Sequence, residues 1–114
     1  MEDKSLFLRT LGENPKLKII DFLMENRIFD YSQKEIIDGC GISKKSFYAN
    51  FGDLVALELV WQTRNVGRAK LYKLNGQNPV VKSLLTLEWR LIKENAEKHS
   101  SREPAKTIAK ASVA

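Results

Sequence analysis

The chain has 114 residues and carries 19 Lys and Arg against 14 Asp and Glu, for a net charge of +5. This length buries enough surface for one small core and not for two, and a composition of 43% hydrophobic and 29% charged residues excludes a wholly disordered chain and a membrane protein. One Cys and one His leave no ligand set for a closed zinc site, while the lone cysteine and a charged N-terminus without a signal-peptide core favour the cytoplasm.

Two helices are expected in the first quarter of the chain. A short one covers residues 3–11, and a longer one begins at Asn14 and Pro15. Asn is a favoured N-cap, and Pro in the first turn loses no hydrogen bond. Apolar side chains then recur at three- and four-residue spacing on one face. In the connector that follows, we expect Phe29 and Tyr31 to cover the edge of the core.

Two further helices joined by a tight turn are expected next. Ser32 and Glu35 have the spacing of a capping box, in which each side chain bonds to the backbone amide of the other residue. This helix can last only two turns because Gly41 follows and can adopt the left-handed backbone that ends a helix. Ser43 caps the next helix, which extends to at least Phe51.

Positive charge is concentrated in the middle of the chain. Residues 43–75 hold six basic and two acidic side chains. Lys44 and Lys45 lie in the first turn of a helix, where the helix dipole disfavours cations. Their presence at this unfavourable position suggests that they bind phosphate. Such a concentration is typical of a surface that binds a polyanion. The alternative is that these lysines only keep the protein soluble.

A β-hairpin is expected after the third of these capped helices. Residues 59–64 and 69–74 are rich in β-branched, aromatic and aliphatic side chains, and the four residues between them, Asn-Val-Gly-Arg, form a turn sequence. Trp61 and Tyr72 should pack in the core or at the root of the hairpin. Cys40, in the turn before Ser43, is interpreted as a small residue that the turn tolerates, with no redox role.

The last predicted helix begins at Pro79 and ends near Lys98, and residues 99–114 are predicted to form a flexible tail. Its apolar surface is wider than a terminal helix of one small domain requires. The helix either covers its own domain or packs against a second copy, and we favour the homodimer. The interface would then consist of Val80, Leu84, Leu87 and Leu91.

Three segments carry a resemblance to a known family: Tyr31–Ile37, Gly41–Tyr48 and Thr63–Tyr72. They resemble the winged helix-turn-helix transcription regulators, in particular small archaeal winged-helix DNA-binding proteins. The resemblance implies a mainly α fold with a small β-hairpin and a long C-terminal helix. It also implies that the helix after Ser43 lies in the major groove of double-stranded DNA, with the hairpin on the neighbouring backbone or minor groove. The position before the first hairpin strand, often glycine in this family, is Glu58.

The resemblance divides the chain into a DNA-binding domain over residues 1–78, a dimerisation helix over 79–98 and the tail over 99–114. Lysines at the helix start can reach phosphates, an asparagine can pair with adenine, and an arginine beside a turn glycine can enter a minor groove. Carried over by position, the DNA contacts are Ser43, Lys44, Lys45, Ser46, Tyr48 and Asn50 on the helix and Arg64, Asn65, Arg68 and Lys70 on the hairpin.

These residues predict a sequence-specific, double-stranded DNA-binding transcription regulator that acts as a homodimer. No enzyme, cofactor or metal site is expected, because the sequence has no phosphate-cradling glycine loop, no zinc spacing and no Ser–His or Cys–His motif. One alternative is a winged-helix adaptor that binds other proteins without DNA. A second is an RNA-binding protein, for which Tyr48 and Tyr72 would supply the stacking surface.

Overall fold

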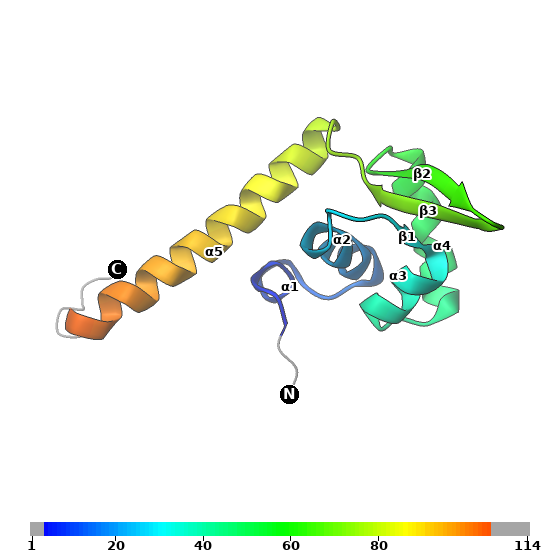
Figure 1. Cartoon of the computed structure of the whole chain (residues 1–114). Coiled ribbons are helices and arrows are strands. Elements are labelled where there is room, and N and C mark those ends of the chain that lie inside the picture. Colours follow the sequence, from blue (N-terminus) through cyan, green and yellow to red (C-terminus); the bar gives the residue numbers. More distant parts are fainter. Residues whose placement is uncertain (1–3, 106–114) are drawn as a thin grey trace.

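The structure, a computed structural model, describes residues 4–105, with side chains described up to residue 96. Within this range the chain forms five helices and a small antiparallel sheet, which confirms the predicted mainly α fold with a hairpin and a long C-terminal helix. Figure 1 shows their arrangement. The elements are α1 (Leu6–Leu11), α2 (Pro15–Glu25), β1 (Tyr31–Ser32), α3 (Gln33–Cys40), α4 (Lys44–Ala56), β2 (Val60–Val66), β3 (Ala69–Leu74) and α5 (Pro79–Ala105).

The predicted helix caps are confirmed. The side chain of Asn14 accepts a hydrogen bond from the amide of Leu17 at 2.9 Å, and Ser43 caps α4 in the same way at 3.0 Å. At α3 both bonds of the capping box are present, 3.2 Å from the Glu35 amide to the Ser32 hydroxyl and 2.8 Å from the Ser32 amide to the Glu35 carboxylate. These bonds satisfy amides that have no partner within the helix.

Two residues with positive φ shape the turns beside α4. Gly41 has φ 70° and ψ 34°, and its amide donates to the carbonyl of Ile37 at 3.0 Å. Glu58, which precedes β2, has φ 62°. A side chain makes this left-handed conformation costly, which explains why glycine is favoured at such a position. The Asn75 side chain stabilises the turn by donating to the carbonyl of Glu58 at 3.0 Å.

The sheet has one strand more than the sequence predicts. Its order is β1-β3-β2, and β1 pairs with β3 through Tyr31 opposite Tyr72. The hairpin is also tighter than predicted, because Val66 pairs with Ala69 and leaves a two-residue loop in place of a four-residue turn. The register of β2 against β3 shifts between Gln62 and Arg64, so that β2 contains a bulge.

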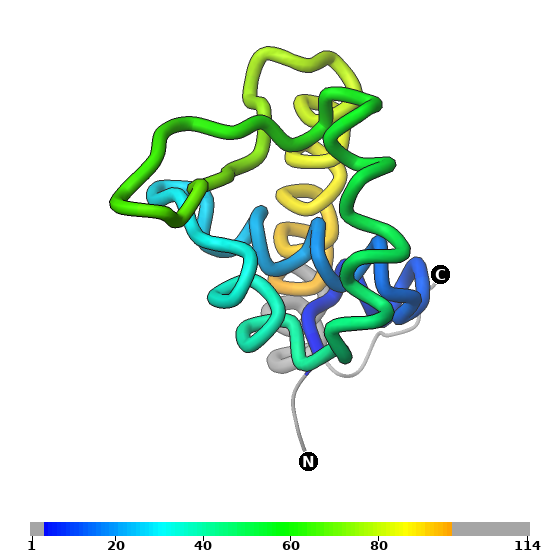
Figure 2. Tube along the Cα trace, turned by 90° about the vertical axis from the view of Figure 1, so that its right-hand side faces the viewer, coloured from blue at the N-terminus to red at the C-terminus, as the bar shows by residue number. Residues whose placement is uncertain are grey.

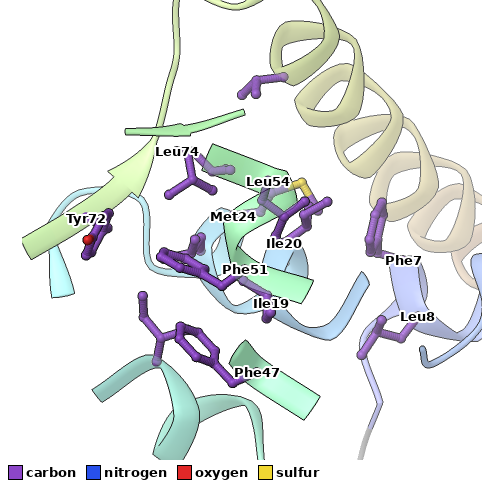
Figure 3. Packing of buried hydrophobic residues seen from close by; sticks show 14 residues of the cluster. Phe7, Leu8, Ile19, Ile20, Met24, Phe47, Phe51, Leu54, Tyr72 and Leu74 are labelled. Atoms are coloured by element: carbon purple, nitrogen blue, oxygen red, sulfur yellow. The ribbon is translucent and has the colours of Figure 1, made fainter. Parts of the chain in front are cut away.

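One hydrophobic core joins the helices to the sheet. Side chains from α1, α2, α4 and β3 converge in it, as Figure 3 shows. The rings of Phe47 and Phe51 stack with centroids 4.5 Å apart, and Phe51 meets Tyr72 edge-on at 4.9 Å. These contacts fix α4 against β3, and they therefore set the position of the hairpin relative to the helix-turn-helix.

The predicted contact of Phe29 with the edge of the core is wrong, because Phe29 is 67% exposed. Trp61, which was predicted in the core or at the root of the hairpin, is 41% exposed and lies at the root, opposite Lys73. Tyr31, by contrast, packs edge-on against Phe22 at 5.2 Å, and Tyr72 is buried as predicted. Tyr31 and Tyr72 lie on paired strands over the helices, whereas Trp61 lies on β2 at the edge of the sheet, where less of the core reaches it.

Helix α5 begins at Pro79 as predicted but continues to Ala105, where the sequence predicted an end near Lys98. At 1.5 Å per residue it is about 40 Å long. It runs beside α1 and ends far from the hairpin, as Figure 1 shows. The predicted tail over 99–114 is therefore helical to residue 105, and residues 106–114 lie outside the described residues.

The face of α5 that covers the domain includes part of the predicted dimer interface. Val81 is fully buried, whereas Val80 is 54% exposed. Leu84, Leu85 and Leu87 are half-buried and pack against the core. Two of the four residues predicted to contact a second copy, Leu84 and Leu87, therefore contact their own domain first.

Candidate nucleic-acid interface

The start of α4 presents cations and hydroxyls on the surface. The Ser43 hydroxyl caps the helix by accepting from the amide of Ser46, and Ser43, Lys44 and Lys45 are exposed. Within the part of the chain that the structure describes, neither lysine pairs with a carboxylate. The free amides and the lysines therefore face solvent together, an arrangement that attracts anionic oxygens.

A hollow of about 580 Å³ lies between α3, α4 and the hairpin. It brings Tyr48 of α4 together with Arg68 and Lys70 of the hairpin. Figures 1 and 2 agree in placing the hairpin beside α3. Of the predicted contacts, Tyr48 of the helix thus lies on the same side of the molecule as Arg68 and Lys70 of the hairpin. The residues that line the hollow are Ser32, Gln33, Lys34, Tyr48, Arg68, Ala69, Lys70 and Tyr72.

Tyr48 lies between the core and the solvent. Its ring packs edge-on against Phe47 at 5.2 Å, yet the residue remains 59% exposed. Its hydroxyl lies 3.5 Å from Oε1 of Gln33 at the start of α3. The ring is therefore held at its base by the core, while its polar end stays available in the hollow.

Two predicted contacts have partners within their own element. The side-chain amide of Asn50 is half-buried and donates to the carbonyl of Ser46 at 2.7 Å. Asn65 accepts from the side-chain amide of Gln62 at 2.9 Å. Each bond occupies one of the two polar atoms of its side-chain amide. A two-bond contact from Asn50 to a base edge would therefore require its Nδ2 to turn away from the Ser46 carbonyl.

Arg64 lies in a different environment from the one predicted. Its guanidinium donates to both carboxylate oxygens of Asp30, at 3.0 Å from Nε and 3.1 Å from Nη2. The hydroxyl of Thr63 donates to the same carboxylate. The hydrogen bonds from Arg64 and Thr63 lower the pKa of Asp30 to about 2. Arg64 is thus bound to the protein through its planar fork, which is the part that would grip a phosphate.

Sequence reasoning missed Lys34 as a member of this surface. It lies in the first turn of α3 with its side chain 82% exposed, and it pairs with Asp38 at 3.2 Å. The signal used for Lys44 was available here too, because a cation in the first turn of a helix opposes the helix dipole. For Asp30 no local signal existed, since its partner lies 34 residues further along the chain.

The remaining groups show no catalytic or metal-binding arrangement among the described residues. Burial raises the pKa of the Cys40 thiol to about 12, and its Sγ lies 3.6 Å from the carbonyl of Lys18. Such a thiol is not an activated nucleophile. Within the range described, no three His, Cys, Asp or Glu side chains gather as a metal site. Among the helices of that range, none combines the length and apolarity needed to cross a membrane.

No family model and no curated protein matches the chain. Among solved structures, the chain is similar to Sso10a-2, described as a DNA-binding protein from Sulfolobus solfataricus, with 18% sequence identity and a TM-score of 0.48. The similarity covers 83% of this chain and 96% of that one. A likeness at this level leaves the fold and the site to be established from the residues of the chain itself.

Proposed function

We propose that the chain binds double-stranded DNA as a sequence-specific transcription regulator, with α4 in the major groove and the hairpin on the neighbouring backbone or minor groove. The observation that carries the proposal is the hollow that Tyr48 shares with Arg68 and Lys70. A helix and a basic hairpin on the same side of a small domain match the two elements that a duplex would contact in adjacent grooves.

The exposed residues of this surface divide by chemistry. Lys44 and Lys45 bind phosphate oxygens beside the free amides of α4, and the hydroxyls of Ser43 and Ser46 add neutral bonds. Tyr48 reaches a base edge. The hairpin contributes Arg68, which belongs to the two-residue loop at its tip and is placed for a narrow minor groove. Lys34 and Lys70 contact the phosphates between the two grooves. Asn50 and Asn65 contribute two-bond contacts only after their present side-chain hydrogen bonds are broken.

The salt dependence of binding follows from this set. Each neutralised phosphate contributes about −0.9 to the slope of log K against log salt. Lys34, Lys44, Lys45, Arg68 and Lys70 therefore give a slope of about −4.5 for one copy, and about twice that for a dimer. Arg64 is left out because two hydrogen bonds hold its planar fork on Asp30. Lys34 is counted because it meets the exposed Asp38 through a single 3.2 Å contact.

The homodimer remains part of the proposal, with a modified interface. Trp89 and Ile92 are 58% and 53% exposed on α5, and Val80 is 54% exposed. Trp89 and Ile92 offer apolar surface to a second copy, and the modified interface centres on them. Val80 lies about 180° around the helix from Trp89, on the originally predicted face with the half-buried Leu91 and the outer edges of Leu84 and Leu87. Two recognition helices about 34 Å apart would then read a palindromic site.

The test is binding of a random duplex at 50 and 200 mM salt, followed by selection of bound sequences from a random pool. Binding at low salt with the slope above supports the proposal. Arg68→Ala should weaken binding about 10-fold across all sequences, whereas Lys82→Ala, which removes the same charge from exposed α5, should not. No binding at the lower salt would contradict the proposal and favour the protein-binding adaptor, and a preference for single strands would favour RNA.

A further inference from the structure

The hydrogen bonds of Asp30 cross the sheet. Asp30 immediately precedes β1, while Thr63 and Arg64 belong to β2, and β3 lies between these two strands. The carboxylate reaches over β3 to accept from both residues, and its side chain is only 13% exposed. These bonds therefore join the two outer strands of a sheet in which the backbone does not pair them.

The bonds fall at the weak point of the hairpin. The register of β2 shifts between Gln62 and Arg64, so Thr63 is the extra residue of the bulge. A bulge bends its strand and increases the local twist. The direction of the hairpin beyond Thr63 therefore depends on the contacts that fix the bulge.

Little else fixes the outer part of the hairpin. Every residue from Trp61 to Lys70 is exposed, so no apolar burial anchors this part to the core. An isolated two-stranded hairpin is only marginally stable in water. Two kinds of side-chain hydrogen bond meet the bulge. The Thr63 hydroxyl lies 3.2 Å from the carbonyl of Leu71 on the neighbouring strand β3, and the bonds to Asp30 join β2 to the far side of the sheet.

We propose that Asp30 is a positioning residue of the DNA-binding surface. By binding Thr63 and Arg64 at the bulge, it fixes the hairpin in the direction that places Arg68 and Lys70 beside Tyr48. Arg64 then serves the protein rather than the DNA. This inference rests on the proposed function for its consequence, although the positioning itself can be measured without DNA.

The proposal and simple electrostatics predict opposite effects of Asp30→Ala on the affinity for DNA. Replacing Asp30 by alanine removes a negative charge and frees Arg64, so charge alone predicts tighter binding to a polyanion. Positioning predicts weaker binding, because the hairpin loses its direction. Asp53 provides a matched control, since it is an exposed carboxylate paired with Lys16 and lies on α4 away from the hollow.

The first experiment follows backbone amide hydrogen exchange without DNA. Asp30→Ala and Arg64→Ala should each accelerate exchange of the amides in 65–70 by about 10-fold or more. The amides of the core helices in these variants should exchange at the wild-type rate, as should all amides in the control variant Asp53→Ala. Unchanged exchange in 65–70 would overturn the proposal. If Asp30→Ala fails to fold, Asp30→Asn, which keeps the bond from Thr63 and loses the ion pair, takes its place.

The second experiment measures affinity for a random duplex. Asp30→Ala and Arg64→Ala should each weaken binding about 10-fold, the double variant should be no weaker than either one, and Asp53→Ala should bind as tightly as the wild type or more tightly. Arg64→Lys, which keeps the charge but not the fork, should behave as Arg64→Ala does. Tighter binding by Asp30→Ala, or a salt slope that falls by about 0.9 in Arg64→Ala, would overturn the role of Arg64.

The two experiments separate the two proposals. If the wild-type protein binds no duplex, the proposed function fails, and hydrogen exchange alone then decides whether Asp30 positions the hairpin. If the wild type binds and both variants bind equally well with wild-type exchange, the proposed function stands and the positioning role is wrong.

Discussion

Two glycines in helices differ in the space around them. A Cβ added at Gly39 would lie 2.2 Å from a ring carbon of Phe22, whereas a Cβ at Gly52 would meet no atom within 4 Å. Gly39 thus lets α3 pack closely on α2, in contact with the ring that also supports Tyr31. Gly52 performs no such packing and only adds flexibility to the unfolded chain.

Alanine at these two positions should therefore change stability in opposite directions. Gly39→Ala is expected to lower the free energy of unfolding by about 1–3 kcal/mol, because the half-buried Phe22 ring, which packs against the core and Tyr31, must move. Gly52→Ala is expected to raise it by about 0.5–1 kcal/mol. Urea unfolding of both variants checks this, and a change of the same sign in the two would show that the surroundings of Gly39 do not matter.

At the scale of elements, structure that is decided within one helical turn could be predicted. Ser32 and Ser43 accept bonds from amides three residues ahead, and Gly41 ends α3 by its own conformation. Strand β1 could not be predicted, because two residues are too few to show an alternating pattern. They form a strand through their pairing with β3, which lies far along the chain. The exposed position of Phe29 follows from tertiary packing in the same way.

The candidate site divides along the same line. Tyr48, Arg68 and Lys70 were predicted as contacts because the resemblance carries them over by position, and Arg68 also lies beside a turn glycine. That they line one hollow depends on the packing of Phe51 against Tyr72, which no local pattern contains. Arg64 was carried over in the same way, yet a distant carboxylate binds it.

Helix α5 has two apolar faces with different roles, and each can be tested alone. Val81 is fully buried, so Val81→Ala should lower the free energy of unfolding by about 2 kcal/mol through the cavity it leaves. Trp89 and Ile92 are exposed, so alanine at both should abolish self-association. At protein concentrations too low for the wild type to dimerise, the unfolding midpoint should stay almost unchanged. Urea unfolding and sedimentation equilibrium separate the outcomes. A double variant that unfolds early would place these side chains in the core, and one that still dimerises would contradict the proposed interface.

For the whole molecule, carboxylates fall into two groups that oppose each other in their effect on stability. Burial raises the pKa of Asp21, Glu25 and Glu88 above the ordinary values of 3.8 and 4.5, and nearby carboxylates add to the effect at both glutamates. A bond from Lys4 lowers the pKa of Glu13. Asp30 belongs with Glu13, because Arg64 and Thr63 hold its pKa at about 2.

These directions predict a stability maximum in mild acid. A raised pKa means that the folded state binds the proton more tightly, so Asp21, Glu25 and Glu88 lower stability as the pH rises from about 4.5 toward 7. The contribution of Asp30 is complete above 3.8 and is lost as the pH falls toward 2. Thermal unfolding at fixed ionic strength should therefore show a higher midpoint at about pH 5 than at pH 7, and a fall below about pH 4.

Two variants test which carboxylates cause the fall in stability on each side of the pH maximum. Glu88→Gln removes a half-buried carboxylate whose only ion pair, among the described residues, is a 3.6 Å contact with Arg27, so it should flatten the limb between pH 5 and 7. Asp30→Asn should flatten the limb below pH 4 and leave the other unchanged, because that carboxylate titrates only in acid. A wild-type midpoint that rises from pH 5 to 7 would mean that these acids are not desolvated. For Glu88, the docking of α5 on the domain would then be looser than the structure has it.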